Sequence, residues 1–308
     1  MYRIGIDLGG TNIAAGVVDE GQHIVAEVSL PTGAERPAEA VVADICRAAE
    51  KAMEKAGITA AHCASVGIGS PGTCDSANGV VVRAYNLGWF NVPVCSMVTA
   101  QLGLPCHLSN DANCAALAET VAGGAVGCRN MILITLGTGV GGGIIVDGKI
   151  VSGLGGAGGE VGHSILVLDG APCTCGRRGC WEAYASATAL IRQGREAAAA
   201  HPESLLNRYA ALTGRDVFDA ADAGDAAAQA VLERYYVYVA AGVTDLVNIL
   251  SPEMVLIGGG ISRQGERLLA PIRRYVAANC FGGEERPQPV IQAAKLGNEA
   301  GIIGAAAL

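Results

Sequence analysis

The stretch RIGIDLGGTNIAAGVVDEGQHIVAEVSL, residues 3–30, determines the fold that we expect for this chain. Its apolar residues fall in short runs separated by turns that contain glycine, which predicts three strands in a meander. The stretch MILITLGTGVGGGIIVDGKIV, residues 131–151, repeats the order of strand, glycine turn, strand, turn and strand. This weak internal duplication predicts two halves that each open with a β-meander.

Helices are predicted between and after these meanders. Apolar residues at helical spacing predict a helix over 38–57 that ends at Gly57, a helix after SNDAN at 109–113, and a mostly helical region over 186–250. SVGIGSPG at 65–72 and EMVLIGGGI at 253–261 are typical of buried strands, and NEAGIIGAAAL at 298–308 of a closely packed helix. The mixture predicts an α/β fold in which helices cover sheets.

The length of 308 residues predicts two lobes with a cleft between them, because it exceeds what one core usually holds. We expect a small N-terminal α/β lobe over 1–117, with a C-terminal helix at about 295–308 packing back on it. A larger α/β lobe with a cysteine-rich loop then covers 118–294.

Composition and charge exclude several classes of function. Hydrophobic residues make up 51% and charged residues 16%, as in a globular protein with a large aliphatic interior. The net charge is −8 and no stripe is rich in Lys or Arg, so a nucleic acid would be repelled. No apolar stretch approaches the ~20 residues of a membrane span, and the first strand leaves no room for a signal peptide. We therefore expect a cytoplasmic protein that binds neither membrane nor nucleic acid.

Two glycine turns, DLGGTN at 7–12 and LGTGVGG at 136–142, are candidate phosphate sites. Successive glycines direct backbone N–H groups into a concavity, and a threonine hydroxyl adds a donor. Alternatively, the glycines only allow tight hairpins. The G-x-G-x-x-G spacing of the second turn is not a dinucleotide fingerprint, because β-structure and not a helix follows it, and no P-loop motif occurs. Asp7, a carboxylate that ends a buried strand beside the first turn, would suit Mg²⁺ on a nucleotide phosphate.

Three thiols lie within eight residues in CTCGRRGC, at Cys173, Cys175 and Cys180, whereas the other eight cysteines are scattered and resemble small buried hydrophobic residues. A disulfide framework is improbable in a reducing compartment, and the C-x-x-C spacing of a redox site is missing. Structural zinc takes four ligands, so one more is required, and His163 is near enough to close the loop. A strained disulfide and unliganded thiols are the competing interpretations. Zinc is favoured because such sites contribute ~10–16 kcal/mol in peptides, against ~2–4 for a disulfide.

DLGGTN, LGTGVGGG, GEVGH and CTCGRRGCWE, in this order, resemble the ROK family of bacterial sugar kinases, within the actin-like ATPase and hexokinase superfamily. The resemblance runs over essentially the whole chain. It implies a two-lobed, ribonuclease H-like fold and an ATP-dependent hexose kinase that needs ATP and Mg²⁺ and forms a homodimer or homotetramer. ROK regulators carry an additional N-terminal helix-turn-helix, and this sequence begins its first strand at once, which disfavours a repressor.

The resemblance also implies roles for particular residues. His163, Cys173, Cys175 and Cys180 resemble the ligands of a structural zinc ion, and Glu160, His163 and Glu182 resemble residues that bind sugar hydroxyls, although Glu182 could be a solvated charge beside Trp181. Asp111 alone would be read as a helix N-cap. The resemblance instead makes it the catalytic base that activates the C6 hydroxyl, with Asn110 holding a sugar hydroxyl. The implied nucleotide-binding residues are Asp7, Gly9, Gly10, Thr11, Asn12, Thr138, Gly139, Gly258 and Gly259.

The sugar is expected to be glucose. GGAGGEVGH at 155–163 lacks the H-P-E-x-G-H form of ROK fructokinases, and SPGTCDSANGVVVRAYNLGW at 70–89 resembles the corresponding loop of ROK glucokinases. N-acetylmannosamine is the second choice, and mannose and allose stay open. From other classes, a sugar sensor without turnover is disfavoured by Asp7, Asp111 and both glycine turns, and an acetyl or carboxyl kinase would not need the paired glutamates.

Overall fold

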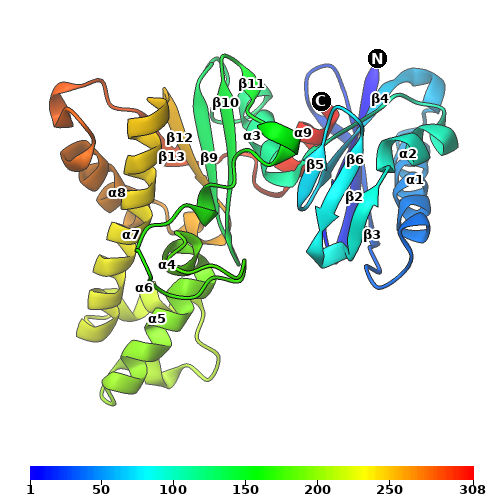
Figure 1. Ribbon diagram of the computed structural model, residues 1–308. Helices are drawn as coiled ribbons and strands as arrows, with labels where there is room; N and C mark the ends of the chain where they lie inside the picture. Colours follow the sequence, from blue (N-terminus) through cyan, green and yellow to red (C-terminus); the bar gives the residue numbers. More distant parts are fainter. The chain divides into compact units, whose positions relative to one another are not determined.

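A computed structural model describes residues 1–308, which form two compact units (Figure 1). The first unit contains Met1–Arg129, Gly143–Gly159 and Lys295–Leu308, and the second contains Asn130–Gly142 and Glu160–Ala294. By contacts, residues 118–129 and 143–159 thus group with the first unit, whereas the predicted division placed them in the second lobe. The predicted division into lobes stays a prediction.

The first unit contains a five-stranded sheet in the order β3-β2-β1-β4-β8. The first three strands form the predicted antiparallel meander, and β4 and β8 extend it in parallel on the other side of β1. Because parallel strands end at one edge of the sheet, β1 and β8 bring Asp7 and Asn110 toward the same edge. The strands are β1 (Tyr2–Leu8), β2 (Asn12–Val18), β3 (Ile24–Pro31), β4 (Cys63–Ser70) and β8 (Cys106–Asn110).

Helices cover this sheet on both faces. Helix α1 (Ala38–Lys55) packs on β2 and β3, and helix α9 (Ala300–Ala306) packs on β1, on β4 and on helix α3 (Asp111–Val121). Ile4, Ile6 and Leu8 of β1 are fully buried in the core that also contains α1. The alternating positions of β1 face α9, where a Cβ on Gly5 would overlap the Ile302 carbonyl. Glycine therefore lets the backbone of α9 lie directly against the strand.

The second five-stranded sheet has the order β11-β10-β9-β12-β13. Strands β9, β12 and β13 are parallel and belong to the second unit. The predicted sequence of strand, glycine turn, strand, turn and strand is confirmed in β9, β10 and β11. The strands are β9 (Met131–Leu136), β10 (Val140–Val146), β11 (Lys149–Ile150), β12 (Met254–Gly258) and β13 (Val290–Ala293).

The helical region predicted over 186–250 is confirmed, and α7 is its long central helix, with α5, α6 and α8 packed against it. No helix is both long and apolar enough to cross a membrane. The helices of this unit are α4 (Glu182–Ala185), α5 (Ala187–Ala200), α6 (Gly214–Asp222), α7 (Ala226–Leu250) and α8 (Glu266–Asn279).

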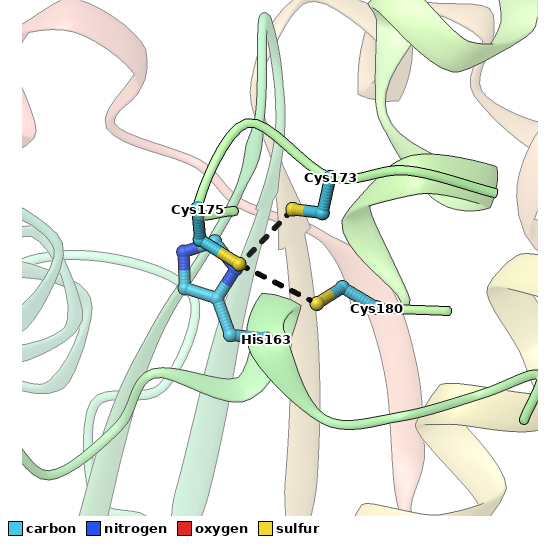
Figure 2. A group of neighbouring side chains, drawn as sticks. All are labelled: His163, Cys173, Cys175 and Cys180. Carbon is cyan, nitrogen blue, oxygen red and sulfur yellow. Dashed lines mark hydrogen bonds between the residues drawn. The ribbon is translucent and has the colours of Figure 1, made fainter. Parts of the chain in front are cut away.

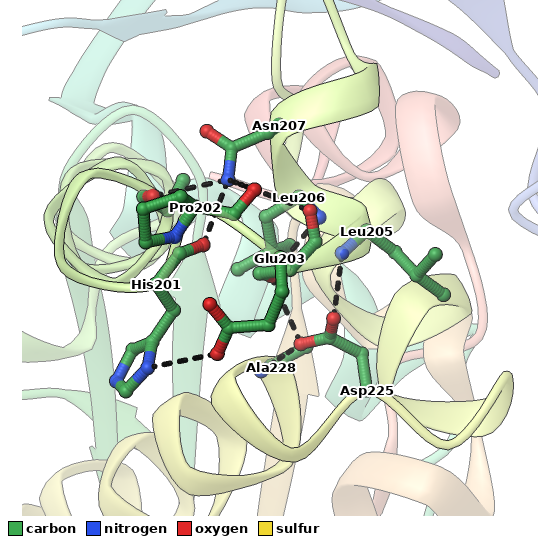
Figure 3. Close-up of polar contacts among 10 residues, drawn as sticks. His201, Pro202, Glu203, Leu205, Leu206, Asn207, Asp225 and Ala228 are labelled. Atoms are coloured by element: carbon green, nitrogen blue, oxygen red, sulfur yellow. Dashed lines mark hydrogen bonds and ion pairs between the residues drawn. The ribbon is translucent and has the colours of Figure 1, made fainter.

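Asp225 caps α7 and ties down the loop that joins α5 to α6 (Figure 3). Its carboxylate accepts hydrogen bonds from the N–H groups of Ala228 at 2.7 Å and Leu205 at 2.6 Å, and from the hydroxyl of Ser204 at 3.0 Å. Burial alone would raise the pKa of Asp225, but the donated hydrogen bonds outweigh it and hold this pKa below its ordinary value. The loop is thus held by a charged acceptor.

Several elements were not predicted. A three-stranded antiparallel sheet follows β4 in the first unit, and a short helix follows that sheet. Helix α8 and strand β13 of the second unit were also missed. The bounds of the sheet and the short helix are β5 (Thr73–Asp75), β6 (Val80–Ala84), β7 (Trp89–Val92) and α2 (Val94–Leu102).

Candidate active site

The first glycine turn joins β1 to β2. The Gly9 N–H donates to the Asn12 carbonyl at 2.9 Å, which closes the turn. The N–H groups of Gly10 and Thr11 lie outside the strands and donate to no acceptor in the protein. A half-buried amide such as that of Gly10 normally finds a partner, and Thr11 is exposed, so this turn offers unused donors that suit an anion.

Asp7 lies at the end of β1, on the face that contacts α9. The Asp7 carboxylate occupies the space beside Gly301 of α9, where a Cβ would overlap this carboxylate. Burial, and second the negative charge of Asp111, raise the pKa of Asp7 to about 6. Two carboxylates in one half-buried site repel each other, and a cation would relieve this repulsion.

The helix cap in SNDAN lies one residue before Asp111, which the simple interpretation made the N-cap. Asn110 is the N-cap of α3: its Oδ1 accepts from the N–H groups of Ala112 at 2.9 Å and Asn113 at 3.3 Å. Its Nδ2 donates to the Gly72 carbonyl at 3.1 Å. Asp111, the first residue of α3, is exposed, and one of its oxygens accepts from the Ala112 N–H at 2.8 Å. The interpretation of Asp111 as an N-cap is therefore wrong, and its carboxylate projects at the helix start.

The second glycine turn joins β9 to β10 and has similar chemistry. The Gly137 N–H donates to the Gly139 carbonyl at 3.0 Å, whereas the N–H groups of Thr138 and Gly139 donate to no acceptor in the protein. The Val140 N–H donates to Glu182 Oε2 at 3.0 Å. Gly258 ends β12, and Gly259 follows with a φ of 81°, so close to Leu136 that a Cβ would overlap its carbonyl. Gly259 thus lies against the end of β9, where the turn begins.

Four side chains of the second unit form a compact cluster, namely His163, Cys173, Cys175 and Cys180 (Figure 2). Each offers one ligand atom, and these atoms all lie within 4.8 Å of one another. Cys173 Sγ is 3.7 Å from His163 Nδ1, and Cys175 Sγ is 3.7 Å from Cys180 Sγ. No disulfide links them, since all eleven cysteines are free. The structure thus brings together all the ligands predicted from the sequence.

The cluster fits a tetrahedral metal ion. Zn–S bonds of about 2.3 Å place two ligand atoms of a tetrahedron about 3.8 Å apart, close to the two separations of 3.7 Å in this cluster. The pKa of Cys175 is lowered to about 6, mainly by a hydrogen bond from the Arg177 backbone N–H. The pKa of Cys173 is raised to about 12, mainly by burial. A bound cation would favour the thiolate form of all three side chains.

Glu182 lies between this cluster and the second glycine turn. Its Oε1 accepts from the Thr174 hydroxyl at 3.1 Å, and its Oε2 accepts from Val140. A Cβ on Gly139 would overlap this carboxylate. Glu182 is therefore not the solvated charge that was the alternative, and Trp181 beside it is buried. Glu160 is exposed and precedes the 3-10 turn Val161–His163, so it lies one turn before the histidine.

The predicted site residues thus form a group in each unit. The first unit holds the first turn, Asn110 and Asp111, and the second unit holds the second turn, the metal cluster, the two glutamates, Gly258 and Gly259. Two residues that contact the turns, Thr32 and Thr188, were not predicted. Thr32 follows β3 and Thr188 lies in the first turn of α5, and no local pattern distinguishes either from an ordinary threonine.

Comparisons with known proteins identify the family. The model of the ROK family matches residues 3–308. A glucokinase of Streptomyces coelicolor is 40% identical, with 99% of this chain and 96% of that protein covered. A glucokinase of Halalkalibacterium halodurans is 38% identical, with 98% and 93% covered. A crystal structure of a ROK family glucokinase from Streptomyces griseus in complex with glucose and AMPPNP aligns with a TM-score of 0.82 at 39% identity, covering 100% of this chain and 98% of that one.

The chain belongs to the ROK family. The match extends over the full chain, so the resemblance found in the four sequence motifs is confirmed. The predicted α/β fold of the actin-like ATPase and hexokinase superfamily is confirmed with it.

Proposed function

We propose that this protein is an ATP-dependent glucose kinase, which transfers the γ-phosphoryl group of ATP to the C6 hydroxyl of glucose. The observation that carries the proposal is the pair of carboxylates, Asp7 and Asp111, beside a glycine turn with two unused N–H donors. A carboxylate at a helix start can take a proton, and the turn can hold an anion. Phosphoryl transfer to an alcohol needs both.

Asp111 is the proposed base. Its carboxylate accepts the proton of the C6 hydroxyl, while the hydroxyl oxygen forms a bond to the γ-phosphorus. The bond between that phosphorus and the bridging oxygen of the β-phosphate breaks, and ADP leaves with the electron pair. The site must mainly position the reactants, because the transition state has little covalent help from the protein. The rigid start of α3, capped by Asn110, supports such positioning.

The two glycine turns are the proposed phosphate sites. The free N–H groups of Gly10, Thr11, Thr138 and Gly139 would donate to phosphate oxygens, and Gly258 and Gly259 would border the adenosine. Asp7 would hold Mg²⁺, directly or through water, and Asn12 would complete the first turn. When bound, Mg²⁺ neutralises charge on the phosphates. The residues fit a cation because Asp7 is a carboxylate whose ionised form burial disfavours.

The sugar would be held by Asn110, Glu160, His163 and Glu182, together with Asp111. Asn110 retains one N–H for this purpose, because its Oδ1 caps α3 and its other N–H donates to Gly72. Glu160 is exposed and free to accept from hydroxyl groups. A hydrogen bond between a hydroxyl and a carboxylate contributes about 1.5–3 kcal/mol. Glu182 would exchange its present donors, Cys173, Thr174 and Val140, for sugar hydroxyls.

The cysteine and histidine cluster is the proposed zinc site. When bound, zinc would supply rigidity to the loop, which carries Glu182 two residues after Cys180 and follows Glu160 closely. Ordering these glutamates in advance spares the conformational entropy that a mobile loop would lose on binding sugar. A cytoplasmic location and a homodimeric or homotetrameric state are further parts of the proposal, and light scattering after size exclusion tests the second.

A coupled assay of ADP release across a panel of hexoses tests the proposal. With Mg²⁺ and ATP, glucose should give the highest kcat/KM among glucose, N-acetylmannosamine, mannose and allose, and the product should be glucose 6-phosphate by phosphorus NMR. A higher kcat/KM with N-acetylmannosamine would assign the alternative substrate. Saturable binding of glucose without ADP release from any sugar would instead indicate a sensor.

A further inference from the structure

The two glycine turns are held in the same way, by donors that bind their carbonyl oxygens. In the first unit, the Thr32 hydroxyl donates to the Gly9 carbonyl at 2.7 Å and the Thr32 N–H donates to the Thr11 carbonyl at 2.8 Å. In the second unit, the Ala187 N–H donates to the Gly137 carbonyl at 2.8 Å and the Thr188 hydroxyl donates to the Thr138 carbonyl at 2.8 Å. Each turn thus has two carbonyls bound by one amide and one threonine hydroxyl.

Binding a carbonyl also orients the next amide. A trans peptide is planar, so its C=O and the N–H of the following residue point in opposite directions. The carbonyl of Gly9 directed at Thr32 turns the Gly10 N–H away from Thr32. The carbonyls of Gly137 and Thr138 do the same for the N–H groups of Thr138 and Gly139. These three N–H groups are among those that donate to no protein acceptor.

The bound carbonyls also protect an anion from repulsion. A carbonyl oxygen that rotated into the concavity would present negative partial charge to a phosphate, and glycine offers little resistance to such a rotation. The threonine hydroxyls supply the restraint that the glycines lack. Each turn can therefore keep glycine, which permits close approach of a ligand, without losing the direction of its donors.

Further contacts fix Thr32 itself. Its side chain is fully buried, and its carbonyl accepts from Arg36 Nη2 at 2.7 Å. Arg36 also donates to the Gly33 carbonyl at 3.2 Å and to Asp44 Oδ2 at 2.6 Å. Asp44 is a buried carboxylate of α1. The network thus connects the turn to a helix of the core.

We propose that Thr32 and Thr188 are positioning residues, whose hydroxyls orient the phosphate-binding amides of the two glycine turns. The inference rests on the proposed use of these turns by ATP. It assigns a role to two side chains that do not themselves touch the nucleotide.

The test compares Thr32→Val and Thr188→Val, which delete the hydroxyl with little change in shape, with Thr32→Ser and Thr188→Ser, which keep it. Losing one such hydrogen bond should lower kcat/KM for ATP about tenfold, which corresponds to about 1.4 kcal/mol. The Kd of glucose without nucleotide, measured by calorimetry, should change less than about twofold, since the glucose ligands are other residues. The serine variants should restore most of the loss.

Matched controls are Thr120→Val and Thr244→Val. Their hydroxyls donate to helix carbonyls, those of Leu117 and Ala240, in the first and second unit. Both should leave kcat/KM for ATP unchanged. The inference is overturned if the Thr32 and Thr188 valine variants keep normal kcat/KM for ATP, or if glucose affinity falls as much as nucleotide use, which a purely structural role would cause.

One further readout keeps the inference separable from the proposed function. Calorimetric binding of a non-hydrolysable ATP analogue can be measured even if no hexose supports ADP release, which would refute only the kinase proposal. Weaker analogue binding in the valine variants supports the inference, and unchanged binding contradicts it. If Thr32→Val does not fold, Thr188→Val decides, because the exposed hydroxyl of Thr188 can be removed with little risk to the core.

Discussion

Replacing Asp7 by Asn should make the protein more stable while removing its activity. Burial and the Asp111 charge raise the Asp7 pKa from 3.8 to about 6. Each pKa unit corresponds to about 1.4 kcal/mol, so the ionised Asp7 carboxylate lowers the free energy of unfolding by about 3 kcal/mol. Asparagine keeps the shape of the side chain and carries no charge. Such a trade between stability and function is common at active sites.

The pH dependence gives the sign of the effect. For an acid whose pKa is higher in the folded state, the destabilisation is absent below the unfolded pKa of 3.8 and complete above the folded pKa of about 6. The Asn variant should therefore exceed the wild type by about 3 kcal/mol at pH 7.5 and by about half of that at pH 5. At pH 7.5 this is a rise in melting temperature of about 5 °C.

Differential scanning calorimetry without added Mg²⁺ or nucleotide measures this difference. Glu54→Gln, which removes one exposed carboxylate charge on α1, is the control and should change the melting temperature by less than about 1 °C. Adding Mg²⁺ with a non-hydrolysable ATP analogue should stabilise the wild type more than the Asp7 variant. Equal melting temperatures of the variant and the wild type at pH 7.5 would refute the idea that this carboxylate is held for a cation.

Three further changes test the loop, the second turn and the fold. Cys175→Ser should reduce bound zinc, measured by mass spectrometry, from one ion per chain to almost none. The same change should raise the KM for glucose and lower the stability of the protein. Gly139→Ala should displace Glu182, whose carboxylate occupies the space of the new Cβ, and should raise the KM for glucose at least about tenfold. Asp225→Ala should lower the free energy of unfolding by about 3 kcal/mol in urea denaturation above pH 4, because a helix cap and two further hydrogen bonds to a buried carboxylate are lost. This difference should shrink as the pH falls through the lowered pKa of Asp225.

Local patterns account for the parts of the fold that could be predicted. The meanders at residues 2–31 and 131–150 have clear alternation and glycine turns, and α7 has helical spacing over 25 residues. The three-stranded sheet over residues 73–92 was missed because its strands are short and Gly79 and Gly88 interrupt the alternation. SNDAN contains several residues that can cap a helix, and sequence alone could not select Asn110.

The candidate site was predictable where its residues are close in sequence. The close spacing of Cys173, Cys175 and Cys180 predicts a metal site, and His163 precedes Cys173 by ten residues. Thr32 could not be found in this way. Its contact with Gly9 spans 23 residues and exists only because β3 pairs with β2 and so ends beside the turn that precedes β2. The contact of Thr188 with Thr138 spans 50 residues. Long-range hydrogen bonds of single polar side chains leave no periodic signal.

Single-turnover and steady-state kinetics of Asp111→Asn, combined with glucose calorimetry, test most directly whether Asp111 is the base. The account predicts that the variant binds glucose within about threefold of the wild type and turns over at least about 100-fold more slowly, because proton transfer is lost and the pocket is kept. Turnover near that of the wild type would contradict it.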